Sequence, residues 1–228
     1  DMIAGDLQLG GSNKEVTVFL SDIRGFTKFS EGHTPEEVVG MLNEYFGIMV
    51  TIITANHGIV DKFVGDAIMA VWGAPNSSGD DQNFALKACL EMRVALGELN
   101  KRRLSIGQSA IMIGMGLHTG RAISGTIGSN ERMEYTVIGD TVNLTARIEA
   151  STKSFGTDLL VSDAIVASLP STYLYSLAGE AEVKGKSEPI KMYLVRGYRD
   201  AVSGEEMIIE TPYSSYSAEA DEKVKVVA

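Results

Sequence analysis

The amino-acid sequence predicts an α/β (α+β) fold: a ferredoxin-like βαββαβ sandwich core with a C-terminal extension of a helix and strands. Two observations favour this fold class. Strand-like runs and helical 3–4 spacings of apolar residues follow one another in the order βαββαβ, and Gly-Asp at 65–66 separates two β-rich runs, as in a hairpin. With 228 residues, 44% of them hydrophobic, the chain is long enough to bury one sizeable core.

Each element of this core has its own signal. A capping box at Thr34 and Glu37, with Pro35 at the first helical position, begins a helix. The expected elements are a linker at 1–14, a strand at 15–21, a helix at 35–54, a hairpin at 58–64 and 67–72, a helix from 78–82 to about 101, and strands at 110–118 and 121–127.

The second half of the chain extends the core. Asp140 is expected to cap a helix at 139–152. The remaining elements are a short strand at 158–161, a short helix at 162–168 and strands near 172–178, 181–185 and 190–196, which complete a domain at 15–199. Residues 200–228 hold seven acidic residues against two lysines and show little periodicity, so we expect an acidic, disordered tail.

Charge and cysteine content exclude several classes of protein. The formal net charge is −10 and the sequence has no basic stripe, so nucleic-acid binding is not expected. Cys89 is the one cysteine; its helical pattern predicts inert core packing, and a lone thiol fits a reducing compartment.

The sequence has no run of about 18 apolar residues, so we expect no membrane contact within it. The start at Asp1-Met2 suggests an excised domain. We therefore expect a cytoplasmic location, with room for the chain to be the cytosolic domain of a larger membrane-bound signalling protein.

Two aspartates are candidates for a metal site. Asp22 ends the first strand and Asp66 lies at the tip of the hairpin, and in this fold the two elements are neighbours. Paired carboxylates suit Mg²⁺, which completes its octahedron with water and phosphate oxygens. The backbone N–H groups of residues 24–27, those of Phe26 and Thr27 among them, could bind the phosphates. The alternative is a pair of solvated turn formers.

A second candidate group lies on the helix at 139–152. Asn143 and Arg147 are four residues apart and share one face, beside an apolar stripe of Leu144 and Ile148. Such an amide and guanidinium could bind a phosphate, or could form a solvated edge. Lys184-Gly185-Lys186 has the same two interpretations, a phosphate clamp or a basic turn.

Five motifs in register resemble a known family. They are "FLSDIRGFT", "DKFVGDAIMAVWGAP", "GLHTGRAISGTIGS", "YTVIGDTVNLTARIE" and "VKGK". Together, over about residues 15–198, they resemble the class III nucleotidyl cyclase catalytic domain of the bacterial adenylyl cyclase type.

The resemblance implies a homodimer with two active sites at the subunit interface. One subunit supplies Asp22, Asp66 and the backbone carbonyl of Ile23 to two Mg²⁺ or Mn²⁺ ions per site. The other subunit supplies the base-reading pair and the residues near the ribose and phosphates, namely Lys62, Thr136, Asn143, Arg147 and Lys184. A strand rises about 3.3 Å per residue, so Lys62 lies about 13 Å from Asp66 along the hairpin, and in the dimer the two residues serve different nucleotides.

The base-reading pair favours ATP as the substrate. Adenine offers an acceptor at N1 and a donor at N6, which complement a lysine donor and a threonine acceptor. The resemblance implies that guanylyl cyclases of the family have Glu and Cys at these two positions, a pattern that this chain lacks. The expected reaction is the conversion of ATP to 3′,5′-cyclic AMP and pyrophosphate by two-metal catalysis. The alternatives are a guanylyl cyclase and an inactive nucleotide-binding regulatory module.

One position departs from some relatives. They carry an arginine where this chain has Gly114, and the resemblance implies that this arginine contacts phosphate. Arg121 or Lys186 could take its place.

Overall fold

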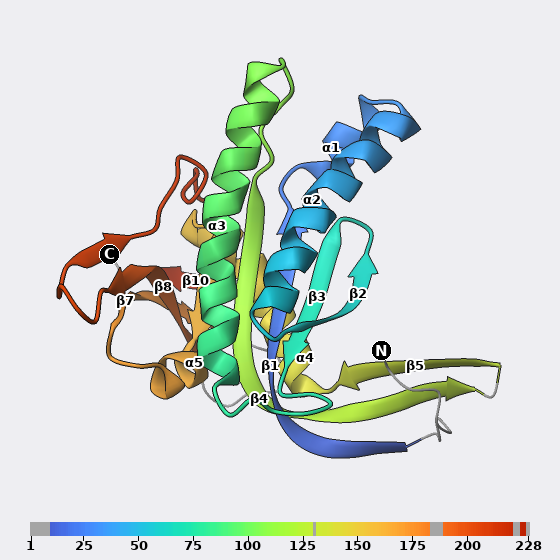
Figure 1. Cartoon of the computed structure of the whole chain (residues 1–228), viewed down its shortest axis with the longest axis vertical. Helices are drawn as coiled ribbons and strands as arrows, with labels where there is room; N and C mark the ends of the chain where they lie inside the picture. The colour runs from blue at the N-terminus through green and yellow to red at the C-terminus, as the bar shows by residue number, and fades with distance from the viewer. Residues whose placement is uncertain (1–9, 130, 183–188, 221–223, 227–228) are drawn as a thin grey trace.

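The computed structural model describes residues 10–129, 131–182, 189–220 and 224–226 (Figure 1). The first half of the chain forms β1 (Gly10–Ile23), α1 (Phe26–Glu31), α2 (Pro35–Ala55), β2 (Ile59–Val64), β3 (Ala67–Trp72), α3 (Asp81–Ser105) and β4 (Ile113–Ser129). The second half forms β5 (Arg132–Ile138), α4 (Asp140–Phe155), β6 (Leu159–Ser162), α5 (Asp163–Ser168), β7 (Tyr173–Ala181), β8 (Ile190–Arg199), β9 (Glu206–Ile208) and β10 (Val224–Val226). The predicted fold class is confirmed.

β1 is the central strand of the part of the sheet that matters here. It pairs antiparallel with β3 on one side and with β4 on the other, and β2 lies outside β3. The order β4-β1-β3-β2 is the ferredoxin-like arrangement, and β6, β8 and β7 continue the sheet beyond β4. Because Ser21 pairs with Ile68, the end of β1 lies beside the β2–β3 turn.

Helices cover both faces of this sheet. Alternate residues of β1 enter different cores, because strand side chains point to opposite faces. Phe19 belongs to the core that contains Met49 of α2 and Leu86 of α3. Val18 belongs to a second cluster, against which Val142 of α4 packs.

Several predicted elements are confirmed, and three details are wrong. The hairpin and the capping box of α2 form as expected, with Thr34 accepting from the Glu37 amide. The linker prediction is wrong at residues 10–14, which belong to β1 and pair with β4. The predicted break within 110–127 is absent, because β4 is continuous from Ile113 to Ser129, and at Gly120 the Thr141 side chain of α4 approaches closely. The N-cap of α4 is Gly139, and Asp140 is its first helical residue.

An arm projects from the body of the molecule (Figure 1). It consists of β5, the half of β4 with which β5 pairs, from Ile123 to Ser129, and the start of β1, which pairs with the same half of β4. The arm exposes large apolar side chains, namely Ile123, Ile127, Met133 and Ile138.

The prediction of a disordered tail is wrong for the described residues after 199. β9 pairs with β8 and β10 pairs with β7. The Ile209 carbonyl accepts a 2.7 Å hydrogen bond from Arg93, and the Tyr216 hydroxyl donates to the Thr157 carbonyl at 2.6 Å. Several of these contacts use backbone groups, which the acidic composition does not reveal.

α2 is long and apolar enough to cross a membrane by length and composition alone. Its Met41, Tyr45, Met49 and Ile53 are buried in the main core, however, and the helix packs against α3. α2 therefore packs one face against the core of this fold.

Candidate active site

Asp22 and Asp66 converge at one end of the sheet. Asp22 is the penultimate residue of β1, and Asp66 follows Gly65, whose φ of 62° is a left-handed conformation that glycine adopts without strain. The Ile23 amide donates a 3.0 Å hydrogen bond to Asp66 Oδ2, which fixes the hairpin tip beside β1. Burial raises the pKa of Asp22, and the neighbouring negative charge of Asp66 raises it further. The predicted proximity of the two carboxylates is confirmed.

This pair fits a divalent cation. Two adjacent carboxylates repel each other, and a cation between them would relieve that repulsion. Within the described ranges, no group of three or more His, Cys, Asp or Glu side chains is placed to hold a metal. Two carboxylates with a neighbouring carbonyl match Mg²⁺, which uses few protein oxygens and retains water and phosphate ligands.

Lys62 and Thr136 lie close together, because both contact the side chain of Asp61. They lie on β2 and β5, and Asp61 joins them. Thr136 Oγ1 lies 2.8 Å from Asp61 Oδ2, and Lys62 Nζ lies 3.4 Å from the same oxygen. The structure therefore places the two predicted base-reading residues side by side within one chain.

The sequence reasoning missed Asp61. Strand alternation would place adjacent residues 61 and 62 on opposite faces. The β2–β3 register instead shifts between Val60 and Lys62, which is the mark of a bulge, and a bulge can re-aim a side chain. The available signal was an acidic residue beside Lys62 in an otherwise apolar strand.

Asn143 and Arg147 lie on α4, as predicted. Leu144 and Ile148 are buried and seat the helix on the sheet, whereas Asn143 is exposed and Arg147 is half-buried. The seat is tight because a Cβ at Gly116 of β4 would lie 2.5 Å from the Glu149 amide nitrogen.

The remaining predicted residues have different outcomes. Phe26 and Thr27 begin α1; Phe26 packs against the core and Thr27 is exposed. The Arg24 amide, which was grouped with them, already donates to the Met112 carbonyl at 2.7 Å. Lys184 lies outside the described residues.

Arg24 occupies the space beside Gly114. A Cβ at Gly114 would collide with the Arg24 guanidinium, which hydrogen-bonds Thr152 and forms a 3.0 Å ion pair with Glu149. Burial raises the pKa of Glu149 to about 7, against the opposing charge of Arg24. Arg121, proposed above as a substitute, is exposed on β4 where it pairs with Glu15, and Lys186 lies outside the described residues.

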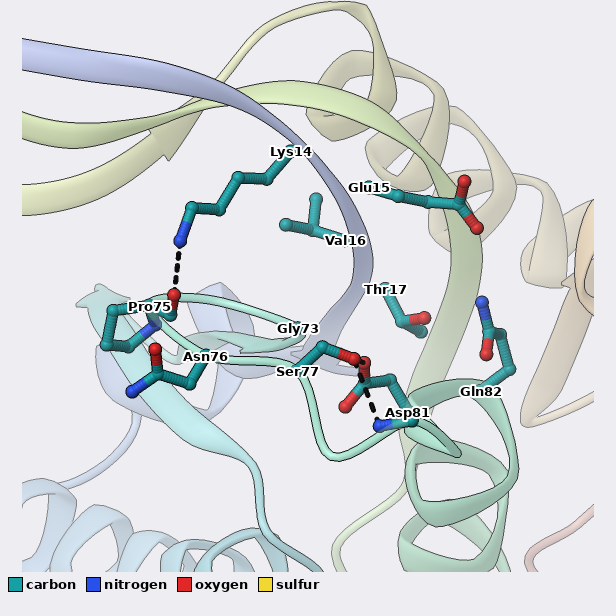
Figure 2. Close-up of a pocket in the computed structure, with 11 residues that line it drawn as sticks. Lys14, Glu15, Val16, Thr17, Gly73, Pro75, Asn76, Ser77, Asp81 and Gln82 are labelled. Carbon is teal, nitrogen blue, oxygen red and sulfur yellow. Dashed lines mark hydrogen bonds between the residues drawn. The ribbon is translucent and has the colours of Figure 1, made fainter.

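A separate polar pocket of about 520 Å³ lies toward the start of β1 (Figure 2). Lys14 hydrogen-bonds the Pro75 carbonyl there, and Asp81 accepts from Ser77 and Ser78. Lys14 and Asp81 are thus engaged in hydrogen bonds within this pocket, which lies at the opposite end of β1 from Asp22 and Asp66.

Comparisons with known proteins agree with this geometry. Residues 11–197 match the family described as the adenylate and guanylate cyclase catalytic domain. Adenylate cyclase 1 of Rhizobium meliloti is 37% identical over 190 residues, which cover 83% of this chain and 29% of that protein. The adenylate cyclase of Anabaena cylindrica is 36% identical over 192 residues, which cover 81% and 37%. The chain thus spans about a third of the length of these two relatives.

Solved structures give the same result. The guanylyl cyclase Cya2 superposes with a TM-score of 0.79 at 36% identity, covering 87% of this chain and all of that one. The adenylyl cyclase CyaB from P. aeruginosa superposes with a TM-score of 0.76 at 34% identity, covering 82% and 96%. The chain therefore belongs to the adenylate and guanylate cyclase catalytic domain family.

Proposed function

We propose that this chain is an adenylyl cyclase, which converts ATP to 3′,5′-cyclic AMP and pyrophosphate. Family membership restricts the reaction to nucleotide cyclisation, so the choice of base remains. The choice of adenine over guanine is supported by one observation: Lys62 and Thr136 lie side by side, because both contact Asp61. A lysine donor complements adenine N1, and a hydroxyl acceptor complements the N6 amine.

Guanine would be a poor fit to the same pair. With Lys62 toward N1 and Thr136 toward the 6-position, the ammonium would face the N1–H donor and the acceptor oxygen would face O6. Unpaired or opposed polar groups in a site discriminate strongly between substrates.

Asp22, Asp66 and the Ile23 carbonyl are the groups that would hold two Mg²⁺ or Mn²⁺ ions. When bound, such ions lower the pKa of the ribose 3′-hydroxyl and stabilise charge on the phosphates. In the reaction the 3′-oxygen forms a bond to the α-phosphorus, the bond from that phosphorus to the α–β bridging oxygen breaks to release pyrophosphate, and the 3′-proton passes to solvent water.

The residues of α4 act on the other parts of the nucleotide. Asn143 orients the ribose, and Arg147 neutralises charge that develops on the phosphates in the transition state. Lys184 binds the phosphates, and the backbone amides of Phe26 and Thr27 add further donors to them.

We propose further that two copies of the chain share each site. The exposed apolar side chains of the β4–β5 arm support this proposal, because such patches on soluble proteins commonly mark interfaces. In the homodimer, one subunit supplies Asp22 and Asp66, and its partner supplies the base-reading pair and α4. The domain at 15–199 would function in the cytoplasm, alone or as the cytosolic part of a larger signalling protein.

Product identification tests the proposed reaction. The purified chain is incubated with Mn²⁺ and either ATP or GTP, and the product is identified. We expect cyclic AMP from ATP and little cyclic GTP. Cyclic GTP as the main product would favour a guanylyl cyclase, the activity named for the similar structure Cya2. No cyclic product would favour a regulatory module.

Complementation tests the shared site. Asp66→Asn keeps an acceptor for the Ile23 amide, so it should fold yet be inactive, and Arg147→Ala should be severely impaired. In a mixed dimer one site combines both changes and the other is intact. Random pairing at equal amounts should therefore restore about a quarter of wild-type activity. Subunits that exchange without restoring activity would refute the shared site.

A further inference from the structure

Asp61 is a charged group beside the base-reading pair to which the proposed reaction gives no role. Its side chain is 2% exposed, although it lies on a strand whose other residues are largely half-buried or exposed. The bulge between Val60 and Lys62 places it in the pairing of β2 with β3 as an additional residue. One carboxylate oxygen, Oδ2, accepts a hydrogen bond from Thr136 and also forms the ion pair with Lys62.

This contact fixes the direction of the Thr136 hydroxyl. A hydroxyl can donate one hydrogen bond and accept others, so by itself it can face either a donor or an acceptor. A carboxylate only accepts. At 2.8 Å from Asp61 Oδ2, Thr136 must therefore donate its single hydrogen to Asp61, which leaves only lone pairs for any other partner.

The same oxygen also orients Lys62. The ammonium has three hydrogens and no lone pair, so it remains a donor after one hydrogen points toward Asp61 at 3.4 Å. Asp61 therefore holds a donor and an acceptor next to each other with their polarity fixed. Neither group can reverse its role while the carboxylate remains in place.

We infer that Asp61 is a specificity-determining positioning residue, which makes the site select a 6-amino purine over a 6-oxo purine. The inference rests on the proposed reaction. Without Asp61 the Thr136 hydroxyl can rotate and donate to a 6-oxo group, so guanine gains a hydrogen bond that the wild type forbids. Asp61 itself need not touch the nucleotide.

The test replaces Asp61 with an apolar residue of similar size. Asp61→Val suits a β-strand and removes the acceptor, and Asp61→Ala is a second variant if valine does not fold. The ratio of kcat/KM for ATP to that for GTP should fall by about tenfold to a hundredfold, the range that one hydrogen bond to a charged group supports. Thermal unfolding of each variant checks the fold.

A third substrate separates positioning from a general structural role. Purine riboside triphosphate keeps N1 but has no group at the 6-position, so Thr136 has nothing to read. Asp61→Val can affect this substrate only through Lys62 at N1, so we expect kcat/KM for it to change by less than the ATP-to-GTP ratio changes. An equal loss with all three nucleotides would overturn the inference.

Glu134→Gln is the matched control. Glu134 lies on β5 two residues before Thr136, its side chain is 52% exposed, and Lys62 lies close enough to influence its carboxylate. Its carboxylate pairs with Arg132 at 2.7 Å, so its replacement should leave the ATP-to-GTP ratio unchanged. A wild type that makes no cyclic product would refute the proposed reaction, whereas an ATP-selective wild type with an unchanged ratio in Asp61→Val would refute only the role of Asp61.

Discussion

Replacing the buried Arg93 should destabilise the protein more than replacing any exposed charged side chain. Arg93 of α3 and Asp158, just before β6, are 3% and 4% exposed. The guanidinium binds the carboxylate through two hydrogen bonds of 2.8 and 2.6 Å. Its third nitrogen donates to the carbonyls of Val195 and Ile209, at 3.0 and 2.7 Å. One side chain thus connects α3 with the residue before β6, with β8 and with the segment after β9.

The expected magnitude follows from what Arg93→Met leaves behind. Asp158 would be buried as a charge without its partner, and two carbonyls would lose a donor. Removing one partner of a buried ion pair costs about 3–5 kcal/mol. For a protein of this size, 1 kcal/mol lowers the melting temperature by roughly 2–4 °C, so the variant should melt roughly 6–20 °C below wild type.

Urea unfolding followed by circular dichroism measures the loss. Arg196→Met is the control, because its ion pair with Glu210 is 56% and 39% exposed and should contribute no more than about 1 kcal/mol. The double variant Arg93→Met with Asp158→Leu removes both charges and should recover part of the loss. A single variant within about 1 kcal/mol of wild type, or a double variant less stable than the single, would refute this reasoning.

Three further predictions concern single side chains. Gly114→Ala should lower stability by about 1–3 kcal/mol, because its Cβ would collide with Arg24, and an unchanged urea midpoint would contradict that packing. Burial raises the pKa of Cys89 to about 12, so iodoacetamide at pH 8 should leave the native protein unlabelled and modify it only in denaturant. Burial raises the pKa of Glu149 from 4.5 to about 7, so its stabilising contribution is complete below about pH 4.5 and is lost as the pH rises through 7. With a chelator present, the unfolding free energy of Glu149→Gln should therefore rise relative to that of wild type between pH 5 and pH 9, by up to about 3 kcal/mol. A difference that does not change with pH would contradict the raised pKa of Glu149.

The core topology could be predicted because its signals are local. The capping box at Thr34, the Gly65-Asp66 turn and the apolar periodicities each fix one element, and their order then fixes the ferredoxin-like arrangement. The convergence of Asp22 and Asp66 followed from that topology, since both lie where neighbouring strands end.

Other features could not be predicted, because they depend on register or on backbone contacts. The bulge at Asp61 changes the face of one residue without any turn residue to mark it. The predicted gap between the strands at 110–118 and 121–127 contains Gly120, which in the structure makes room for α4 within the continuous β4. The segment from β9 to Glu219 is held partly through backbone groups, such as the Glu219 amide that donates to the Lys153 carbonyl at 2.9 Å, and such bonds leave no trace in composition.

The packed segment after β8 also changes where the folding unit ends. The family match stops at residue 197. The Ile209 carbonyl nevertheless accepts a hydrogen bond from Arg93, and the Tyr216 hydroxyl accepts one of 3.3 Å from Nε of Arg24, which lies two residues after Asp22. A recombinant fragment cut at the family boundary would keep every motif of the family. It would nevertheless lose partners of the buried Arg93 and the half-buried Arg24, so expression trials and domain swaps should carry the chain through at least Glu219.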